Sequence, residues 1–243
     1  MMRLFGLLFL VLSLWACNAK SEKENWYEIS ELLFEDSFSD GSLSNWISEI
    51  QEDSCSSVLV RDGKMDIDVC KGASIWLDQY FEGGVLIEYD ATVIGKGGPN
   101  DRVSDLNCFW NATDPRNPKD LFNSPRKASG MFHDYDTLQL YYVGMGGHNN
   151  TKTRFRRYAG DGNKPLLAGH DLSSSDVLIE ANKTYRIQLI ALNGRVQFIR
   201  DGAVIYDFKD AEAYEKGWFG IRTINNHMSV DNVKVYQIKG KDE

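Results

Sequence analysis

Apolar and polar residues alternate along most of the chain with the two-residue period of β-strands. Residues 185–192, 195–200 and 203–208 form three such runs, joined by Asn193-Gly194 and Asp201-Gly202. These dipeptides supply the positive φ angles that two-residue hairpin turns require. Further runs rich in β-branched and aromatic side chains cover residues 84–94, 106–110, 137–144, 217–224 and 228–238. Helical periodicity is almost absent, so the pattern predicts an all-β sandwich or barrel.

Another hairpin is predicted around Asp62-Gly63, with residues 58–61 and 64–67 as its strands. In this register Arg61 faces Lys64, and the same alignment sets Cys55 opposite Cys70. We therefore expect a disulfide between these two cysteines, with two buried free thiols as the alternative. Cys108 lies between Asn107 and Phe109 and is expected to be a buried core thiol.

The N-terminus has the features of an export signal. Arg3 precedes an apolar run over residues 4–15, which is too short for a permanent membrane span. The run ends in Leu14-Trp15-Ala16-Cys17, which resembles the lipobox of bacterial lipoproteins and implies cleavage before Cys17 and acylation of its thiol. An ordinary signal peptide is the alternative. We expect a signal peptide at 1–16, a lipid anchor and linker at 17–31, and one domain at 32–240.

Charge narrows the choice of partners. The net charge is -8, but residues 22–53 alone hold ten Asp or Glu against one Lys, so the remainder is nearly neutral. No basic run points to nucleic acid.

No later segment is apolar enough to span a membrane, so membrane contact is expected only through the lipid anchor. A monomer in the bacterial cell envelope, periplasmic or on the outer-membrane surface, is the expected state.

Several segments resemble concanavalin-like jelly rolls. Residues 33–46 resemble the opening strand of that fold, residues 185–208 its central meander, and residues 220–222 with 230–235 its closing strands. Within that superfamily the chain is similar to YesU-like domains, through residues 141–151, 154–158 and 217–227. The resemblance implies a jelly-roll sandwich of two curved antiparallel sheets, a sugar-binding concave face, and a role in degrading uronate-containing polysaccharides.

Alternation along residues 137–142 gives the first candidate residues. Leu138, Leu140 and Tyr142 share one face, and the leucines indicate the core side. Gln139 and Tyr141 are therefore expected to line the opposite, sugar-facing side. The alternative for Tyr141 is half-buried packing.

A cationic strand follows. In an extended conformation Arg154, Arg156 and Tyr158 share one face, and Phe155 and Arg157 the other. Clustered guanidinium groups favour an anion, and a substrate carboxylate fits their paired donors. The alternatives are a solvated cationic edge and an ion pair with the acidic tether.

All four histidines lie outside the expected strand cores. His148 follows a glycine-rich turn, His227 lies near Arg222 on the closing strands, and His170 is a third candidate base. Paired-histidine metal motifs are missing, so no metal cofactor is expected. A structural calcium ion on the rim, held for example by Asp134 and Asp136, remains an open alternative.

Together these residues favour a carbon–oxygen lyase that acts by elimination on oligo- or polysaccharides containing uronic acid. Tyr141, His148, Arg156 and His227 are the candidate catalytic residues, and the candidate substrate-binding residues are Gln139, Arg154, Tyr158, His170 and Arg222. A polysaccharide lyase would release a glycosidic oxygen, whereas an oligosaccharide dehydratase would release water. The alternatives are a non-catalytic glycan-binding lipoprotein and a glycoside hydrolase with two facing carboxylates.

Overall fold

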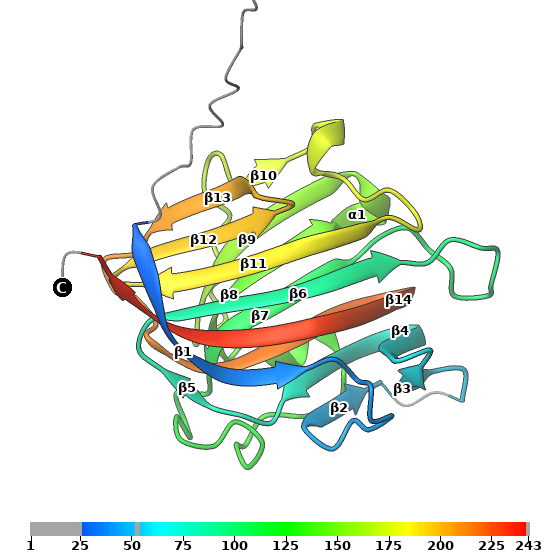
Figure 1. The fold of residues 1–243 in the computed structure, drawn as a ribbon, viewed down its shortest axis with the longest axis horizontal. Coiled ribbons are helices and arrows are strands. Elements are labelled where there is room, and N and C mark those ends of the chain that lie inside the picture. The colour runs from blue at the N-terminus through cyan, green and yellow to red at the C-terminus, as the bar shows by residue number, and fades with distance from the viewer. Residues whose placement is uncertain (1–25, 52–53, 242–243) are drawn as a thin grey trace, which may run out of the picture.

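The computed structural model describes residues 26–51 and 54–241, and strands make up nearly all of its regular structure (Figure 1). The strands are β1 (Tyr27–Asp36), β2 (Trp46–Ile50), β3 (Ser57–Arg61), β4 (Lys64–Leu77), β5 (Phe81–Glu82), β6 (Val85–Val93), β7 (Leu106–Thr113), β8 (Gln139–Gly146), β9 (Lys152–Ala159), β10 (Asp171–Leu172), β11 (Thr184–Leu192), β12 (Arg195–Arg200), β13 (Ala203–Lys209) and β14 (Lys216–Gly240). Three short helical turns connect them: η1 (Phe132–Tyr135), α1 (Gly147–Asn150) and η2 (Ser175–Val177).

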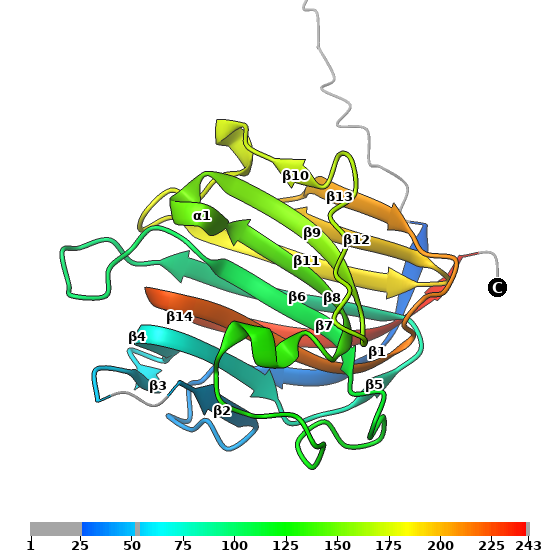
Figure 2. The ribbon, with the colours of Figure 1, turned by 180° about the vertical axis from the view of Figure 1, so that it is seen from behind.

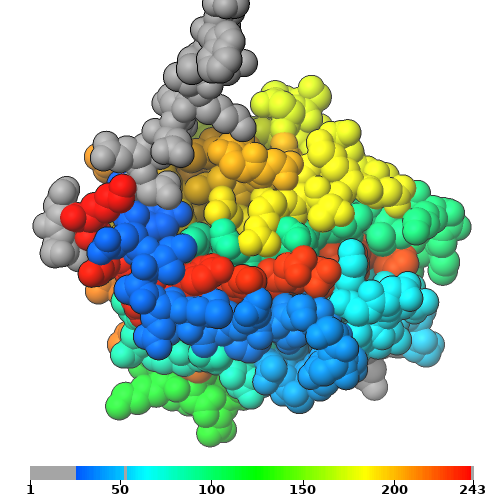
Figure 3. Space-filling view, viewed as in Figure 1, coloured from blue at the N-terminus to red at the C-terminus, as the bar shows by residue number. Residues whose placement is uncertain are grey.

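Two antiparallel layers face each other. The front sheet, which faces the viewer in Figure 2, has the order β10-β9-β8-β7-β14-β4, with β2 beside β4. The back sheet, which faces the viewer in Figure 1, has the order β1-β14-β6-β11-β12-β13. The expected all-β sandwich is therefore present. Figure 3 shows the back sheet from outside, with red β14 running beside blue β1.

Strand β14 belongs to both layers. Its first part pairs with β7 and its last part with β1 and β6, while β4 follows it through the bend. The register shifts between Ile224 and Asn226, and Asn225 between them has a positive φ of 43°. A bulge of this kind lets a strand turn from one sheet to the other. The two runs expected to be separate strands, residues 217–224 and 228–238, are thus one bent strand.

The core lies between the layers and follows the alternation of the strands. Its front-sheet side chains include Cys108, Trp110, Tyr141 and Phe155, and its back-sheet side chains include Tyr89 and Phe198. Cys108 is a free buried thiol, as predicted, and burial raises its pKa to about 12.

The predicted hairpins are confirmed. Arg61 pairs with Lys64, Leu192 with Arg195, and Arg200 with Ala203, and each Asn-Gly or Asp-Gly turn has positive φ at both residues. A disulfide joins Cys55 to Cys70, with their Cα atoms 5.9 Å apart, which confirms the predicted pairing.

One expected boundary is wrong. The sequence predicts a linker that reaches residue 31, but β1 begins at Tyr27. It pairs antiparallel with β14, from Tyr27 opposite Gly240 to Asp36 opposite Val233. The acidic residues there are the exposed side chains of an edge strand, and Glu28 forms an ion pair of 2.9 Å with Lys239. The predicted signal peptide and Cys17 lie outside the described residues. Across 26–51 and 54–241, no helix has the length and apolar character needed to cross a membrane.

The connection between β7 and β8 determines what remains open on the front sheet. We call residues 114–138 the strap, because this segment lies against the outer face of the front sheet, the face turned away from the back sheet (Figure 2, green). Leu121, Tyr135 and Leu138 of the strap are fully buried against Trp76 and Phe109 of the sheet. The molecule thus has a second apolar cluster outside the sandwich core.

Candidate functional site

A cavity of about 270 Å³ opens on the outer face of the front sheet, beside the strap. Strands β8 and β9, the α1 turn between them, the strap and the loop after β9 form its walls. Its lining residues are Asp105, Phe132, Tyr142, Gly144, Gly147, His148, Lys152, Arg154, Arg156, Tyr158 and Lys164. Four residues predicted from the sequence are therefore brought together here: His148, Arg154, Arg156 and Tyr158.

Strand pairing explains why aromatic and cationic side chains meet in this cavity. Tyr142 of β8 lies opposite Arg156 of β9, and Gly144 lies opposite Arg154. Residues opposite each other in an antiparallel pair project from the same face. The Tyr158 hydroxyl is buried without a hydrogen-bond partner, and the Tyr142 hydroxyl makes no hydrogen bond with any described residue. The Tyr142 hydroxyl is therefore available to a ligand, whereas the Tyr158 hydroxyl is an unsatisfied polar group buried in the cavity wall.

The two arginines of the cavity differ in their partners. Arg154 donates from Nε and Nη2 to the carboxylate of Asp171, at 3.0 Å each, and from Nη1 to Nε2 of His148. Arg156 donates to the backbone carbonyl of Lys164, and within the described part of the chain it has no carboxylate partner. Its charge is therefore not neutralised by a neighbour, whereas that of Arg154 is.

A strained turn presents His148. Three consecutive non-glycine residues, His148, Asn149 and Asn150, have φ between 54° and 58°. Each left-handed L-residue costs roughly 1–2 kcal/mol, and such strain collects at functional sites. The side chain of Asn150 offsets it by accepting from the backbone N–H of Ile179 at 2.9 Å and donating to the Ile179 carbonyl at 2.8 Å.

A second contact holds the same turn from the other side. Arg102 donates to Oδ1 of Asn149 at 2.9 Å and to the backbone carbonyls of Ile224 and Asn225 on β14. The turn is therefore tied to the loop before β11 and to the bend of β14, and these contacts hold His148 in the lining of the cavity.

Burial sets the protonation of the two phenols. It raises the pKa of Tyr142 and of Tyr158, and Arg156 and Arg222 oppose this only in part. The hydrogen bond with Asp171 raises the pKa of Arg154, and the same contact lowers that of the carboxyl. The cavity at neutral pH thus holds neutral phenols beside cationic guanidinium groups.

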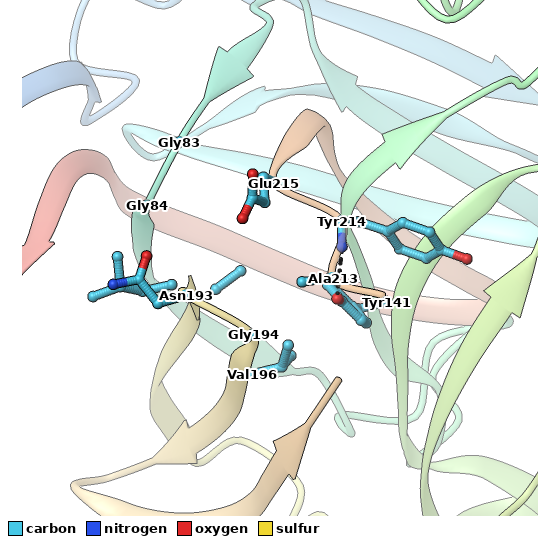
Figure 4. Close-up of a pocket in the computed structure, with 11 residues that line it drawn as sticks. Gly83, Gly84, Tyr141, Asn193, Gly194, Val196, Ala213, Tyr214 and Glu215 are labelled. Atoms are coloured by element: carbon cyan, nitrogen blue, oxygen red, sulfur yellow. Dashed lines mark hydrogen bonds between the residues drawn. The ribbon is translucent and has the colours of Figure 1, made fainter. Parts of the chain in front are cut away.

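The expectation that Tyr141 faces the sugar side is wrong. Its side chain is fully buried between the sheets beside Trp110 and Phe155. Its hydroxyl donates to Asp210 at 2.7 Å and accepts from the backbone N–H of Tyr214 at 2.9 Å, at the edge of a separate cavity of about 110 Å³ (Figure 4). Leu138 and Leu140 are buried as expected, but in the cluster between the strap and the outer face of the front sheet, and not against the opposite sheet.

Tyr142 is the functional candidate that the sequence reasoning missed. The register of the β8–β9 hairpin could have identified it. Tyr142 lies opposite Arg156, so if Arg156 faces the cavity, Tyr142 must face it too.

Three other predicted residues lie outside the cavity lining. Gln139 is half-buried and its amide points to the carbonyl of Ala159. His170 is half-buried and packs edge-to-face on Phe155, and this partial burial lowers its pKa. Arg222 projects from the outer face but is 1% exposed, because it is covered by strap residues and donates to the carbonyl of Gly130.

His227 lies in a different place altogether. It lines a cavity of about 460 Å³ near the Cys55–Cys70 hairpin, with Arg61, Asp66 and Asp101 among its neighbours. Its Nδ1 lies 2.8 Å from Asp101 and its Nε2 lies 3.1 Å from Asp66. The structure therefore does not bring His227 to the cavity that holds His148 and Arg156.

Within the described residues, no group of three or more His, Cys, Asp or Glu side chains could hold a metal ion. Asp134 accepts from Ser129, and Asp136 forms an ion pair with Lys164. Calcium at these two residues stays an untested alternative.

A model of one protein family, described as a domain of unknown function, DUF6250, matches residues 67–233, which is more than half of the chain. The chain belongs to the DUF6250 family. Among curated proteins, no sequence matches this DUF6250 member significantly.

Solved structures show the fold class. A protein of unknown function with a galectin-like fold from Bacillus subtilis is similar over 87% of this chain and 98% of its own, with a TM-score of 0.66 and 20% identity. The carbohydrate-binding module CBM66 from Bacillus subtilis covers 79% and 96%, with a TM-score of 0.53 and 14% identity. LamA from Z. galactanivorans, in complex with laminaritriose and laminaritetraose, covers 86% and 100%, with a TM-score of 0.58 and 13% identity. At these identities the likeness establishes the jelly-roll sandwich, and the predicted fold class is confirmed.

Proposed function

We propose that this protein is a carbon–oxygen lyase that acts by elimination on oligo- or polysaccharides containing uronic acid. The observation that carries the proposal is Arg156. Its guanidinium group has no carboxylate partner among the described residues, yet it shares a cavity with His148 and two phenols that lack acceptors. A substrate carboxylate would complete this arrangement.

The elimination divides into steps that these groups can serve. A base removes the proton from the carbon that bears the carboxylate, and the electron pair left behind spreads onto the carboxylate oxygens. Arg156 stabilises that charge as it develops. The bond from the neighbouring carbon to its oxygen then breaks, a carbon–carbon double bond forms, and the departing oxygen takes up a proton.

The roles follow from protonation. Because Arg154 can only donate, Nε2 of His148 accepts its hydrogen bond in this structure, and Arg154 must release that nitrogen before its lone pair can take the substrate proton. Tyr142 and Tyr158 hold their protons, since burial raises the pKa of both. We assign His148 as the base and one of the two tyrosines as the acid for the departing oxygen.

The resemblance to YesU-like domains supports a uronate-containing substrate, and the likeness to the module CBM66 and to LamA with its bound oligosaccharides supports a carbohydrate. A glycan-binding role is the second candidate, because Phe132 and Tyr142 offer aromatic rings for stacking on a sugar. A glycoside hydrolase is disfavoured, since Asp105 is the single carboxylate among the described residues that line the cavity, and such an enzyme needs two.

The test is ultraviolet absorbance of the soluble domain mixed with a panel of uronate oligosaccharides, followed by mass spectrometry. A new conjugated double bond with loss of water identifies a dehydratase. The same double bond with shortening of the chain identifies a lyase. Saturable binding without any double bond across the panel identifies a glycan-binding protein and overturns the enzyme assignment.

We also propose that the protein is held in the bacterial cell envelope by a lipid on Cys17. The support is the short apolar run that ends in Ala16-Cys17. Cys17→Ser should release the protein from membranes. Retention of the variant in the membrane fraction after a salt wash would contradict the lipid anchor.

A further inference from the structure

The strap covers part of the outer face of the front sheet, the side on which the resemblance placed a glycan. Trp76, Phe109 and Leu140 of the front sheet are fully buried, and Trp218 is 5% exposed, all within the cluster that the strap completes. Such aromatic side chains would form a sugar-stacking surface if they were open. Here they are packed against protein.

Buried polar contacts hold the strap in place. Arg126 of the strap forms an ion pair with Glu49 of β2, and the two side chains are 1% and 3% exposed. The same carboxylate accepts from the Tyr135 hydroxyl at 2.8 Å and from Nε1 of Trp76 at 3.1 Å. A buried charge pair whose carboxylate accepts four hydrogen bonds is costly to break, so the strap is a fixed wall.

A second contact closes the cavity on the side of the strap. Lys164, from the loop after β9, forms an ion pair with Asp136 of the strap, and its ammonium group lies 5.4 Å from the Phe132 ring and 5.5 Å from the Tyr158 ring. This bridge crosses from one wall to the other. A chain that entered the cavity could not continue along the sheet beneath the strap.

From this geometry we infer that the site takes the end of a glycan chain, and that the protein acts on terminal sugars and not in the interior of a polymer. The inference rests on the proposed function. The volume of about 270 Å³ lies just under the roughly 300–1,000 Å³ of sites that enclose drug-sized ligands, which corresponds to about one or two sugar rings. Sugars beyond the first two therefore extend into solvent and add little binding energy.

The first test measures binding, so that it does not depend on turnover. Isothermal titration of the soluble domain uses one series of uronate oligosaccharides of increasing length with the same repeating unit. We expect Kd to change by less than about threefold from the trimer to the hexamer, because no further contacts are made. Arg156→Leu serves as the control and should weaken binding of every member equally, which locates the binding in this cavity.

The second test locates the reaction within the chain. Tandem mass spectrometry should place the new double bond in a terminal sugar of the hexamer, and chemical blocking of that end should abolish the reaction. A double bond in interior sugars, or a Kd that tightens by about tenfold or more across the series, would overturn the inference. Length-independent binding without any double bond would instead leave the terminal site standing and reject the lyase activity.

Discussion

Neighbouring tyrosines on β8 have opposite environments. Tyr141 points into the core, where its hydroxyl is used by Asp210 and the Tyr214 backbone, whereas Tyr142 points into the cavity, where its hydroxyl has no described partner. Residue type alone therefore does not identify a functional side chain in this fold. A functional side chain is identified by the face of the strand from which it projects and by the lack of a hydrogen-bond partner among the described residues.

Arg156→Lys should lower turnover by roughly a hundredfold or more, the scale of one lost transition-state donor. Lysine keeps the charge but loses the paired donors that match a carboxylate. Steady-state kinetics and the melting temperature should be measured together. Little change in melting temperature is expected, because Arg156 is part of an open cavity wall.

Arg157→Lys is the matched control on the same strand. Arg157 points to the other face, where its Nε donates to Asp210 at 2.7 Å and its guanidinium lies 4.2 Å from the Tyr214 ring. This variant should lower the melting temperature and leave activity per folded molecule intact. If Arg156→Lys behaved in this way, its assignment to the substrate carboxylate would be wrong.

Two histidines should shape stability against pH in opposite directions. Burial alone would lower the pKa of His227, but its hydrogen bonds with Asp66 and Asp101 outweigh burial and raise it. Its stabilising contribution is full below the unfolded pKa of about 6.5 and is lost as pH rises through the higher folded value. Burial lowers the pKa of His170, so its protonation destabilises the fold as pH falls below about 6.5.

Melting temperatures between about pH 5 and pH 8.5 test this directly. The wild type should be most stable near the unfolded pKa, with a decline on each side. His227→Gln should flatten the alkaline decline and His170→Phe the acidic one. A variant that shifts the whole curve down without changing its shape would show that the histidine does not titrate as described.

At the scale of elements, the β8–β9 hairpin supplies most of the cavity. Much of it was predictable, since alternation set Arg154, Arg156 and Tyr158 on one face and Phe155 and Arg157 on the other, as found. The assignment of β8 failed for a specific reason. Leucines mark a buried face, but they do not say whether a second sheet or a connecting segment buries it.

Gly144 should be required for the position of Tyr142. A Cβ atom at Gly144 would lie 2.9 Å from Cζ of the Tyr142 ring, so the ring must move away. Gly144→Ala should therefore reduce kcat/KM by about tenfold or more, with a small change in melting temperature because the ring can swing into the cavity. Kinetics and thermal unfolding of the same preparation measure both.

Gly147→Ala is the control for Gly144→Ala, because it adds the same methyl group at another glycine that lines the cavity. Its Cβ would meet no atom closer than 3.8 Å, which is ordinary van der Waals contact. The loss of activity should be clearly smaller than for Gly144→Ala. Equal losses would mean that the methyl group acts by filling the cavity and not by displacing Tyr142.

At the scale of the whole molecule, the sequence predicts the sandwich well and the strap poorly. Hairpin turns, the disulfide and the strand runs follow from local chemistry, which acts over a few residues. The strap depends on Glu49 meeting Arg126 and Tyr135, pairs separated by 77 and 86 residues, and no local pattern reports such contacts. His227 was misplaced for the same reason, since its carboxylate partners come from distant segments.

Arg126→Met should destabilise the protein by about 3–5 kcal/mol, because it leaves the buried Glu49 carboxylate without its counter-charge. Urea unfolding monitored by tryptophan fluorescence measures the change. Arg195→Met is the control, since the Arg195–Asp207 pair is about one-third exposed and should cost no more than about 1 kcal/mol. Equal costs would mean that the strap is not fixed by the buried pair.

Strand β14 supplies 25 residues near the end of the chain and hydrogen-bonds to β1, β4, β6 and β7. During synthesis, these partners emerge long before the strand that pairs them, and β1 must wait for residues 233–240. Contacts between such distant segments form late. The nascent chain therefore cannot complete either layer until residues 216–240 have been translated, so both layers of the sandwich close in one late step.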